Sequence, residues 1–411
     1  MKKIKRFMIL LIIIISCYIV YNIFLNKIVL YNINEYFIIT DYNIFGNHFN
    51  IEGCIAKKLD NPKLILRSFN KEILIDSNMY EEDNNTCFYI SKLNNKGIAL
   101  DDLNTGNYLL LVKDNDKYYS MKNNTDYSNL EYYTMTKNDI NNKINIDYSS
   151  ILNKSYIEFR IKRTKLPKDV YDITIDPGHG GVDSGALGSI NNKQYKESDF
   201  TLKVSLKLKE ELENVGYKVK ITRDSDDNVK PYGKNGRAVI PNEVKSKLSI
   251  SIHINSSESI QNFGGVEVYT PNDIDYTLSR LMADNLSDIV GYSKKQSFKI
   301  YDGVYFNNFT KEDIEEYKTE MSEKNIEMYN VTTNTPYMFM IREVGGKVTN
   351  AYIDGRDDSI DKNLYYNSNQ VAEPYLIELG YINYKNDLIK LIDDTDLYAV
   401  NISKSIKQYY K

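Results

Sequence analysis

Hydrophobic and polar residues alternate with a period of two through residues 34–162, between short turns rich in Asn, Asp and Gly. Successive side chains of a strand point to opposite faces of a sheet, so this period predicts strands with one buried face. Turns at this spacing are typical of a β-sandwich, and Gly106 with Tyr108 just before a strand fits the tyrosine corner of such domains. We expect strands in the segments FNIEGCIA, KLILRS, EILID, CFYISKL, YLLLV and YIEFRIK.

The pattern changes near Asp172, where apolar strands begin to alternate with segments of helical period, as in an α/β fold. One helix is expected from near Phe200 to Gly216, and two more over residues 274–290 and 311–329, the last capped by Thr310. Strands are expected at ITI, YKVKITR, KLSISIHIN, GVEVYT, YMFMIREV and PYLIELGY.

An apolar stretch from Phe7 to Leu25 follows a basic N-terminus and has about the ~20 residues that a membrane-spanning helix needs. Basic flanks stay in the cytoplasm, so the remaining chain is expected outside it. A cleaved signal peptide and a lipid on Cys17 are rival interpretations. The apolar run is long, continues past Cys17 and lacks small residues at a cleavage site, which favours an uncleaved anchor.

These patterns predict three regions and a location. Residues 1–30 form a basic flank and a transmembrane anchor, residues 31–165 a β-sandwich-like extracytoplasmic domain, and residues 166–411 an α/β domain. The protein is expected to be a single-pass protein of the cell membrane. Cys54 and Cys87 lie in the second region, where they either pair outside the membrane or remain buried thiols.

Composition excludes one class of partner. The 411 residues carry a formal net charge of −4, without the polybasic pattern that nucleic-acid binding requires, so no nucleic acid is expected. The chain has only 3 histidines, and one of them, His179, stands in the glycine-rich segment DPGHGGVDSG directly after a predicted strand.

The glycine-rich turn does not match a P-loop or a dinucleotide fingerprint, which leaves metal binding by His179 as the stronger interpretation. His253 also lies near the carboxyl end of a predicted strand, and Glu197 precedes a helix. Open α/β sheets gather ligands at that edge. Two histidines and a glutamate with one open position are the ligand set of a catalytic zinc ion, which lowers the pKa of a bound water to about 7.

A general base is expected on the strand PYLIELGY, which is preceded by Glu373 and contains Glu378. Glu373 lies at the entrance of this strand, whereas Glu378 lies at its exit, on the same edge as the two histidines. Glu378 is therefore the better candidate to take a proton from water and pass it to a leaving amine.

The segments DPGHGGVDSGA, SIHINS, GVEVY and ELGYIN, with a glutamate before a helix, resemble in content and order the zinc-dependent N-acetylmuramoyl-L-alanine amidases of the amidase-3 type. This resemblance covers roughly residues 172–411 and implies one zinc ion on His179, Glu197 and His253, with Glu378 as the catalytic carboxylate. The implied fold is a twisted mixed sheet flanked by helices. The implied substrate is peptidoglycan, cleaved at the amide between N-acetylmuramic acid and L-alanine of the stem peptide.

The sequence departs from that family in an inserted segment, about residues 270–370, which is either a substrate-facing lid or a brace for the sheet. Arg342 and Arg356 within it are expected in ordinary salt bridges rather than on a substrate carboxylate. Asp176 and Asp183 either orient a ligand histidine or stabilise the turn. The β-sandwich-like domain lies outside the resemblance and is expected to set reach or to bind a protein partner.

Two functional classes follow from these observations. The first is an anchored wall hydrolase, and the second is a non-catalytic wall-binding or assembly protein on the same fold. The presence of Glu378 together with the ligand residues favours the enzyme.

Overall fold

The computed structural model describes Leu11, Ile12, Ser16 and residues 33–410, apart from residues 69–70, 95, 124–127, 152–153, 258–263, 273, 324–330 and 352–362. Most of the span predicted over residues 7–25 therefore lies outside the described residues. Within the described part, no helix is both long enough and apolar enough to cross a bilayer. The membrane anchor stays a prediction from the sequence.

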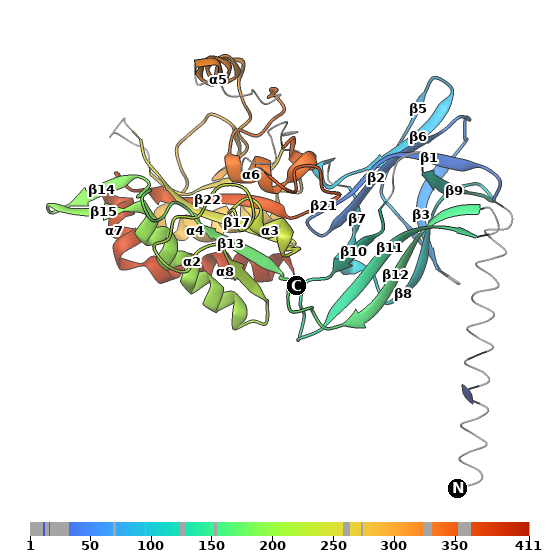
Figure 1. Ribbon diagram of the computed structural model, residues 1–411, viewed down its shortest axis with the longest axis horizontal. Helices are drawn as coiled ribbons and strands as arrows, with labels where there is room; N and C mark the ends of the chain where they lie inside the picture. The colour runs from blue at the N-terminus through green and yellow to red at the C-terminus, as the bar shows by residue number, and fades with distance from the viewer. Residues whose placement is uncertain are drawn as a thin grey trace, which may run out of the picture.

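A sheet of 13 strands occupies the N-terminal half of the chain, in the order β10-β11-β12-β8-β9-β1-β2-β6-β5 with β3, β4, β7 and β21 attached (Figure 1). Its first twelve strands are β1 (Tyr36–Phe45), β2 (His48–Ile55), β3 (Pro62–Ser68), β4 (Lys71–Leu74), β5 (Asn78–Glu82), β6 (Asn85–Ile90), β7 (Ile98–Ala99), β8 (Gly106–Asp114), β9 (Lys117–Asn123), β10 (Leu130–Tyr133), β11 (Asn141–Ile151) and β12 (Lys154–Thr164). Each of the six segments predicted as strands here contains or overlaps one of them.

The 13-stranded sheet folds back on itself around one hydrophobic core. Phe49 on β2 and Phe159 on β12 meet edge to face, with ring centroids 5.3 Å apart, although these two strands do not pair. Phe37, Leu64 and Leu110 belong to the same buried cluster. Burial of such side chains removes apolar surface from water and stabilises the fold by about 1.5–3 kcal/mol for each large side chain.

Two local features of this region answer questions that the sequence left open. Cys54 and Cys87 face each other on the paired strands β2 and β6 and form a disulfide. The Tyr108 hydroxyl donates a hydrogen bond of 3.2 Å to the backbone oxygen of Asn104, which is the contact that defines a tyrosine corner. His48 is the first residue of β2.

The C-terminal half contains a second sheet of 7 strands in the order β16-β13-β17-β22-β18-β20-β19. The strands are β13 (Ile173–Pro177), β16 (Val219–Ile221), β17 (Leu248–Asn255), β18 (Glu267–Tyr269), β19 (Lys299–Tyr301), β20 (Val304–Tyr305) and β22 (Glu373–Tyr381). The pairs β16–β13, β13–β17 and β17–β22 are parallel, whereas β18 runs antiparallel to β22. This is the mixed sheet flanked by helices that the sequence predicts, confirming the α/β class.

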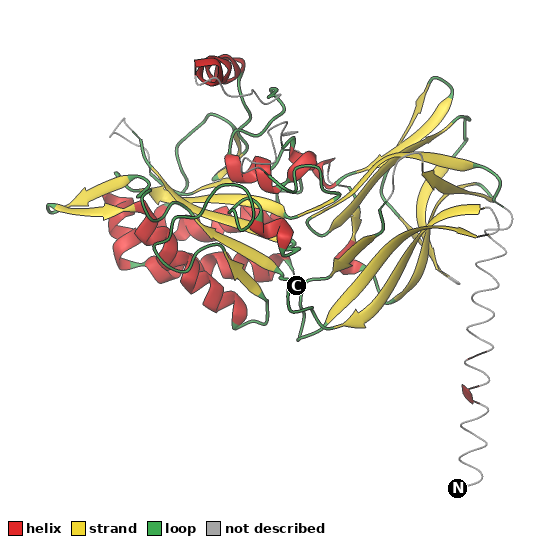
Figure 2. Cartoon of the chain, in the orientation of Figure 1, coloured by secondary structure: helices red, strands yellow, loops and turns green. Residues whose placement is uncertain are grey.

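The two faces of this sheet are covered differently. Helices α2 (Glu197–Glu213), α4 (Thr277–Val290), α7 (Lys385–Asp393) and α8 (Thr395–Tyr409) cover one face, where they share a core with the sheet (Figure 2). The alternating apolar residues of β17, from Leu248 to Ile254, point into that core. His253 points to the opposite face, where α6 (Phe339–Val344) packs against Leu376 of β22.

The prediction of a strand at YMFMIREV is wrong, because residues Phe339–Val344 form helix α6. A short apolar run has no period that separates a buried strand from a buried helix. Met340, Ile341 and Val344 lie on one side of the helix and are buried against Tyr269 and Tyr305.

Along the chain, the remaining elements lie between the strands of the second sheet. They are the hairpin of β14 (Leu187–Ile190) and β15 (Lys193–Lys196), the short helix α3 (Ile240–Glu243), helix α5 (Lys311–Glu323) and strand β21 (Gln370–Val371). The predicted cap of α5 is confirmed, since the Asp313 amide donates to the Thr310 hydroxyl at 3.1 Å. The inserted segment thus contains its own helices and strands.

The two halves of the chain meet through backbone pairing and buried charge. Strand β21 pairs in parallel with β1, so the end of the insertion extends the N-terminal sheet. Lys92 and Glu373 form an ion pair at 2.5 Å with side chains that are 1% and 0% exposed. The buried carboxylate of Asp172, paired with Lys247 at 3.2 Å in the C-terminal half, accepts hydrogen bonds from the Thr136 amide and hydroxyl of the N-terminal half at 3.1 and 2.6 Å.

Candidate active site

His179 lies in the loop that follows β13, and close contacts explain the glycines around it. A Cβ atom on Gly178 would come within 2.5 Å of the His253 ring. A Cβ atom on Gly185 would come within 2.6 Å of the Glu197 carboxylate and 2.7 Å of the His179 ring. Any larger residue would therefore fill the space in which these three side chains meet.

Glu197 is the first residue of α2, three residues before the start expected from the apolar period. Its side chain is almost completely buried, and its Oε1 lies 3.1 Å from both His179 Nε2 and His253 Nδ1. The backbone amides of Ile254 and Ala186 donate to its two oxygens at 2.9 and 2.8 Å. The helix N-terminus adds a favourable field for this negative charge.

His179, Glu197 and His253 offer ligand atoms that all lie within 4.8 Å of one another. They come from a loop, the start of a helix and the end of a strand. The sequence analysis predicts that these residues meet at one edge of the sheet. The Asp183 carboxylate accepts a hydrogen bond of 2.8 Å from His179 Nδ1, so the ring directs Nε2 toward Glu197. This contact orients the ring, the first of the two roles expected for Asp183.

The charges of this cluster shift its protonation equilibria. Burial alone would raise the pKa of Glu197, but hydrogen bonds from His179 and His253 outweigh burial and hold that pKa well below its ordinary value. Burial would lower the pKa of His179, yet the contacts with Glu197 and Asp183 leave it raised. The cluster therefore places concentrated negative charge where two ring nitrogens converge, an arrangement that attracts a cation.

Glu378 lies on β22 in register with His253 on the neighbouring strand β17. Its Oε2 is buried and has no hydrogen-bond partner among the described residues. Burial, reinforced by the negative charges of Glu197 and Glu267, raises the pKa of Glu378 well above its ordinary value. A buried carboxyl group with one unsatisfied oxygen is costly, which is typical of a site built for chemistry rather than for stability.

A cavity of about 680 Å³ opens beside the two histidines and Glu378. His179, His253 and Glu378 line it, and the inserted segment contributes Met338 and Phe339 to its wall. The insertion thus borders the candidate site as well as the sheet. A cavity with apolar walls and a few convergent polar groups is the usual form of a ligand site.

Two arginines brace the loop that carries His179. Arg237 pairs with Asp176 at 3.2 Å and donates to the His179 backbone oxygen at 3.0 Å. Arg223 is 3% exposed and donates to the backbone oxygens of Gly178 and Ser198 at 2.9 Å each. Asp176, which also accepts hydrogen bonds from Thr222 and Ser251, supports the loop and does not contact a ligand ring.

Arg342 forms the ordinary salt bridge that the sequence favoured, with its Nε 2.8 Å from Glu343. Its guanidinium also donates to the backbone oxygens of Pro336 and Tyr337. Arg356 lies outside the described residues.

Glu267 is a buried group beside the site whose role the sequence analysis missed. It lies on β18, in register with Glu378 on the adjacent strand β22, and is 0% exposed. Its carboxylate accepts hydrogen bonds from Ser293 at 2.6 Å, from Tyr269 at 2.7 Å and from Tyr381. The sequence does contain a signal for this group, which is a glutamate between two valines in a short buried strand. A charge of this kind is rarely buried without partners.

Comparison with known proteins places this site in a family. Residues 173–408, more than half of the chain, match the family described as N-acetylmuramoyl-L-alanine amidase, of the amidase-3 type. The germination-specific N-acetylmuramoyl-L-alanine amidase of Bacillus subtilis is 34% identical over 119 residues, which are 26% of this chain and 48% of that protein. The probable cell wall amidase LytH of Staphylococcus aureus is 36% identical over 126 residues, 30% of this chain and 38% of that protein.

The aligned part of the chain thus spans less than half the length of each of these relatives. Among solved structures, the N-acetylmuramoyl-L-alanine amidase AmiC2 of Nostoc punctiforme aligns with 21% identity and a TM-score of 0.37, covering 59% of this chain and 97% of that one. The match over residues 173–408 decides the assignment: the chain belongs to the N-acetylmuramoyl-L-alanine amidase family.

Proposed function

We propose that this protein is a zinc-dependent hydrolase that cleaves the amide between N-acetylmuramic acid and L-alanine of the peptidoglycan stem peptide. The observation that carries the proposal is the meeting, in one cavity, of a cation-binding cluster and a buried carboxyl group with an unsatisfied oxygen. The match to the amidase family supplies the reaction type.

The residues present fit a zinc ion. His179, Glu197 and His253 are donors of the types that zinc prefers, and the 4.8 Å limit on their mutual distances allows one ion to reach all three. A zinc ion bound there would polarise the scissile carbonyl and lower the pKa of water to about 7. The hydrogen bond that His179 Nδ1 donates to the Asp183 carboxylate is the kind of outer contact that fixes a ligand ring.

Glu378 is the general base and acid of the proposed reaction. It accepts a proton as water attacks the amide carbon, and it returns that proton to the alanine nitrogen as the C–N bond breaks. The products are the lactyl carboxylic acid and a free amine, so the atoms of one water molecule are accounted for. Burial raises the pKa of this carboxyl group, which makes its carboxylate a stronger base toward water.

The chain around the ligands orients the reacting groups before substrate binds. Arg223 and Arg237 hold the loop backbone, and close packing at Gly178 keeps the His253 ring in place. A preorganised site lowers the barrier because fewer groups must be ordered during the reaction.

We further propose that residues 1–30 anchor the chain in the cell membrane and that the part from residue 31 onward works outside the cytoplasm. The basic flank and the apolar run over residues 7–25 support this orientation. The Cys54–Cys87 disulfide also supports it, because disulfides persist in oxidising compartments. The β-rich part before residue 165 is proposed as a separate domain that binds a protein partner or sets reach.

A digestion experiment tests the proposed function. Purified wall is treated with the chain in the presence and absence of a chelator, and the broken bond is identified by mass spectrometry and by labelling of new amino termini. We expect new alanine amino termini that disappear with chelator and return when zinc is added. New reducing sugars, or no new termini under any condition, would contradict the proposal.

A further inference from the structure

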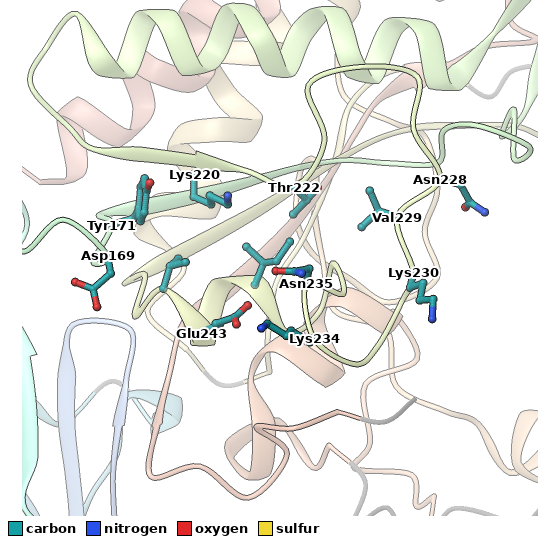
Figure 3. A pocket seen from close by; sticks show the side chains of 12 residues that line it. Asp169, Tyr171, Lys220, Thr222, Asn228, Val229, Lys230, Lys234, Asn235 and Glu243 are labelled. Atoms are coloured by element: carbon teal, nitrogen blue, oxygen red, sulfur yellow. The ribbon is translucent and has the colours of Figure 1, made fainter. Parts of the chain in front are cut away.

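A second cavity, of about 830 Å³, adjoins the candidate active site (Figure 3). Asn228 and Val229 line both cavities, so one wall is shared. Lys220 lies on the edge strand β16 opposite Thr174 of β13, and Thr174 lies opposite Ser249 of β17. Ser249 and His253 are four positions apart on one strand, so Lys220 and His253 lie on the same face of the sheet.

The lining of this cavity carries both signs of charge. Lys220, Lys230 and Lys234 supply ammonium groups, and Asp169 and Glu243 supply carboxylates. Lys220 and Lys234 form no ion pair with any residue that the structure describes. In Figure 3, Asn228 of the shared wall and Lys230 lie at one end of the cavity, whereas Asp169 and Tyr171 lie at the other end.

We infer that this second cavity binds the carboxylate-bearing peptide part of the substrate, an inference that rests on the proposed function. The amide to be cleaved joins a neutral sugar to a peptide with several carboxylates and an amino group. Lys220 and Lys234, which have no salt-bridge partner among the described residues, attract the carboxylates, and Asp169 at the far end attracts the amino group. A phosphate-rich wall polymer fits less well, since Asp169 and Glu243 would repel it.

The test compares two substrates of equal size, a muramoyl peptide with free carboxylates and the same peptide with those carboxylates amidated. The variant is the double substitution Lys220→Gln and Lys234→Gln, and the matched control is Lys209→Gln on α2. We expect wild type and control to prefer the free carboxylates by about 10-fold in kcat/KM, and the double variant to lose most of that preference. An unchanged preference in the double variant would overturn the inference.

Direct binding separates failure of this inference from failure of the proposed function. Free stem peptide is titrated into a Glu378→Gln chain with and without the two lysine substitutions, so that no cleavage is required. A Kd raised about 10-fold by the lysine substitutions supports the inference even if wild type cleaves neither substrate. An unchanged Kd, or a polyol-phosphate oligomer that displaces the peptide at lower concentration than free peptide does, would refute it.

Discussion

Glu373 is the first residue of strand β22 and Glu378 lies in the C-terminal half of the same strand, and their surroundings differ sharply. Glu373 is fully buried, paired with Lys92 at 2.5 Å and hydrogen bonded by the Tyr375 hydroxyl at 2.6 Å. Glu378 is also buried, but its Oε2 has no partner among the described residues. The strand thus carries one glutamate that is paired with a lysine and one that has an oxygen without a hydrogen-bond partner among the described residues.

This difference separates a structural carboxylate from a catalytic one. A buried ion pair holds two parts of a chain together. Removal of either partner leaves the other charge buried without a counter-charge, in a medium that solvates charge poorly. An unmatched buried carboxyl group costs stability and is retained where a substrate or water will complete its bonding.

Substitution Glu378→Gln removes the proton carrier while keeping the shape of the side chain. We expect kcat on muramoyl peptide to fall by about 100- to 10,000-fold, the range of general acid–base catalysis, with the free energy of unfolding unchanged or higher. Amine release and zinc content are measured on the same sample. Full activity in this variant would exclude Glu378 as the base.

Substitution Glu373→Ala should act on stability instead. It leaves Lys92 buried without its partner, and we expect the free energy of unfolding to fall by about 3–5 kcal/mol in denaturant titrations. The double variant Lys92→Met with Glu373→Gln should recover most of this loss, since neither charge then remains. Activity per folded molecule should stay near wild type. A loss of activity as large as that of Glu378→Gln would contradict the assignment of Glu373 as structural and Glu378 as catalytic.

Substitution Asp183→Asn tests the contact that orients His179. We expect zinc affinity to fall by about 10- to 100-fold, because the neutral amide weakens the hydrogen bond to His179 Nδ1. Asp226→Asn is the matched control, as Asp226 accepts from the Gly181 amide in the same loop without touching a histidine. Equal zinc affinity in both variants would remove Asp183 from the site.

Acid should destabilise the N-terminal sheet through His48. Burial, together with the charge of Lys92, lowers the pKa of His48 to about 2. The unfolded chain binds this proton near its ordinary pKa of about 6.5, so stability is lost as pH falls below that value. Since the side chain is only partly buried, we expect a loss of about 1 kcal/mol between pH 7 and pH 5. Denaturant titrations of wild type and His48→Asn should show this slope in wild type only.

Much of the site was predictable because its residues lie next to predicted strand ends and a predicted helix start. His253 interrupts an apolar strand near its carboxyl end, His179 follows another strand, and parallel strands bring such ends together. Glu197 was correctly placed near a helix start, although apolar period alone set that start three residues late. The first helical turn consists of polar residues, which do not contribute to the apolar period. The apolar period therefore does not show where the helix begins.

Other features depend on contacts that no local pattern contains. Helix α6 was predicted as a strand because six apolar or mixed residues fit either form, and packing against Tyr269 and Tyr305 decides between them. The pairing of β21 with β1 joins residues more than 300 positions apart. The role of Glu267 becomes visible only when its strand is placed beside Glu378.

We propose that His179, Glu197 and His253 together hold one zinc ion. Metal analysis of the purified chain and of its His179→Ala variant, after equilibration with zinc and removal of excess, tests it most directly. We predict about one zinc ion per wild-type chain and a large loss in the variant, with near-native far-UV circular dichroism in both. Wild-type zinc content in a folded His179→Ala chain would contradict the claim.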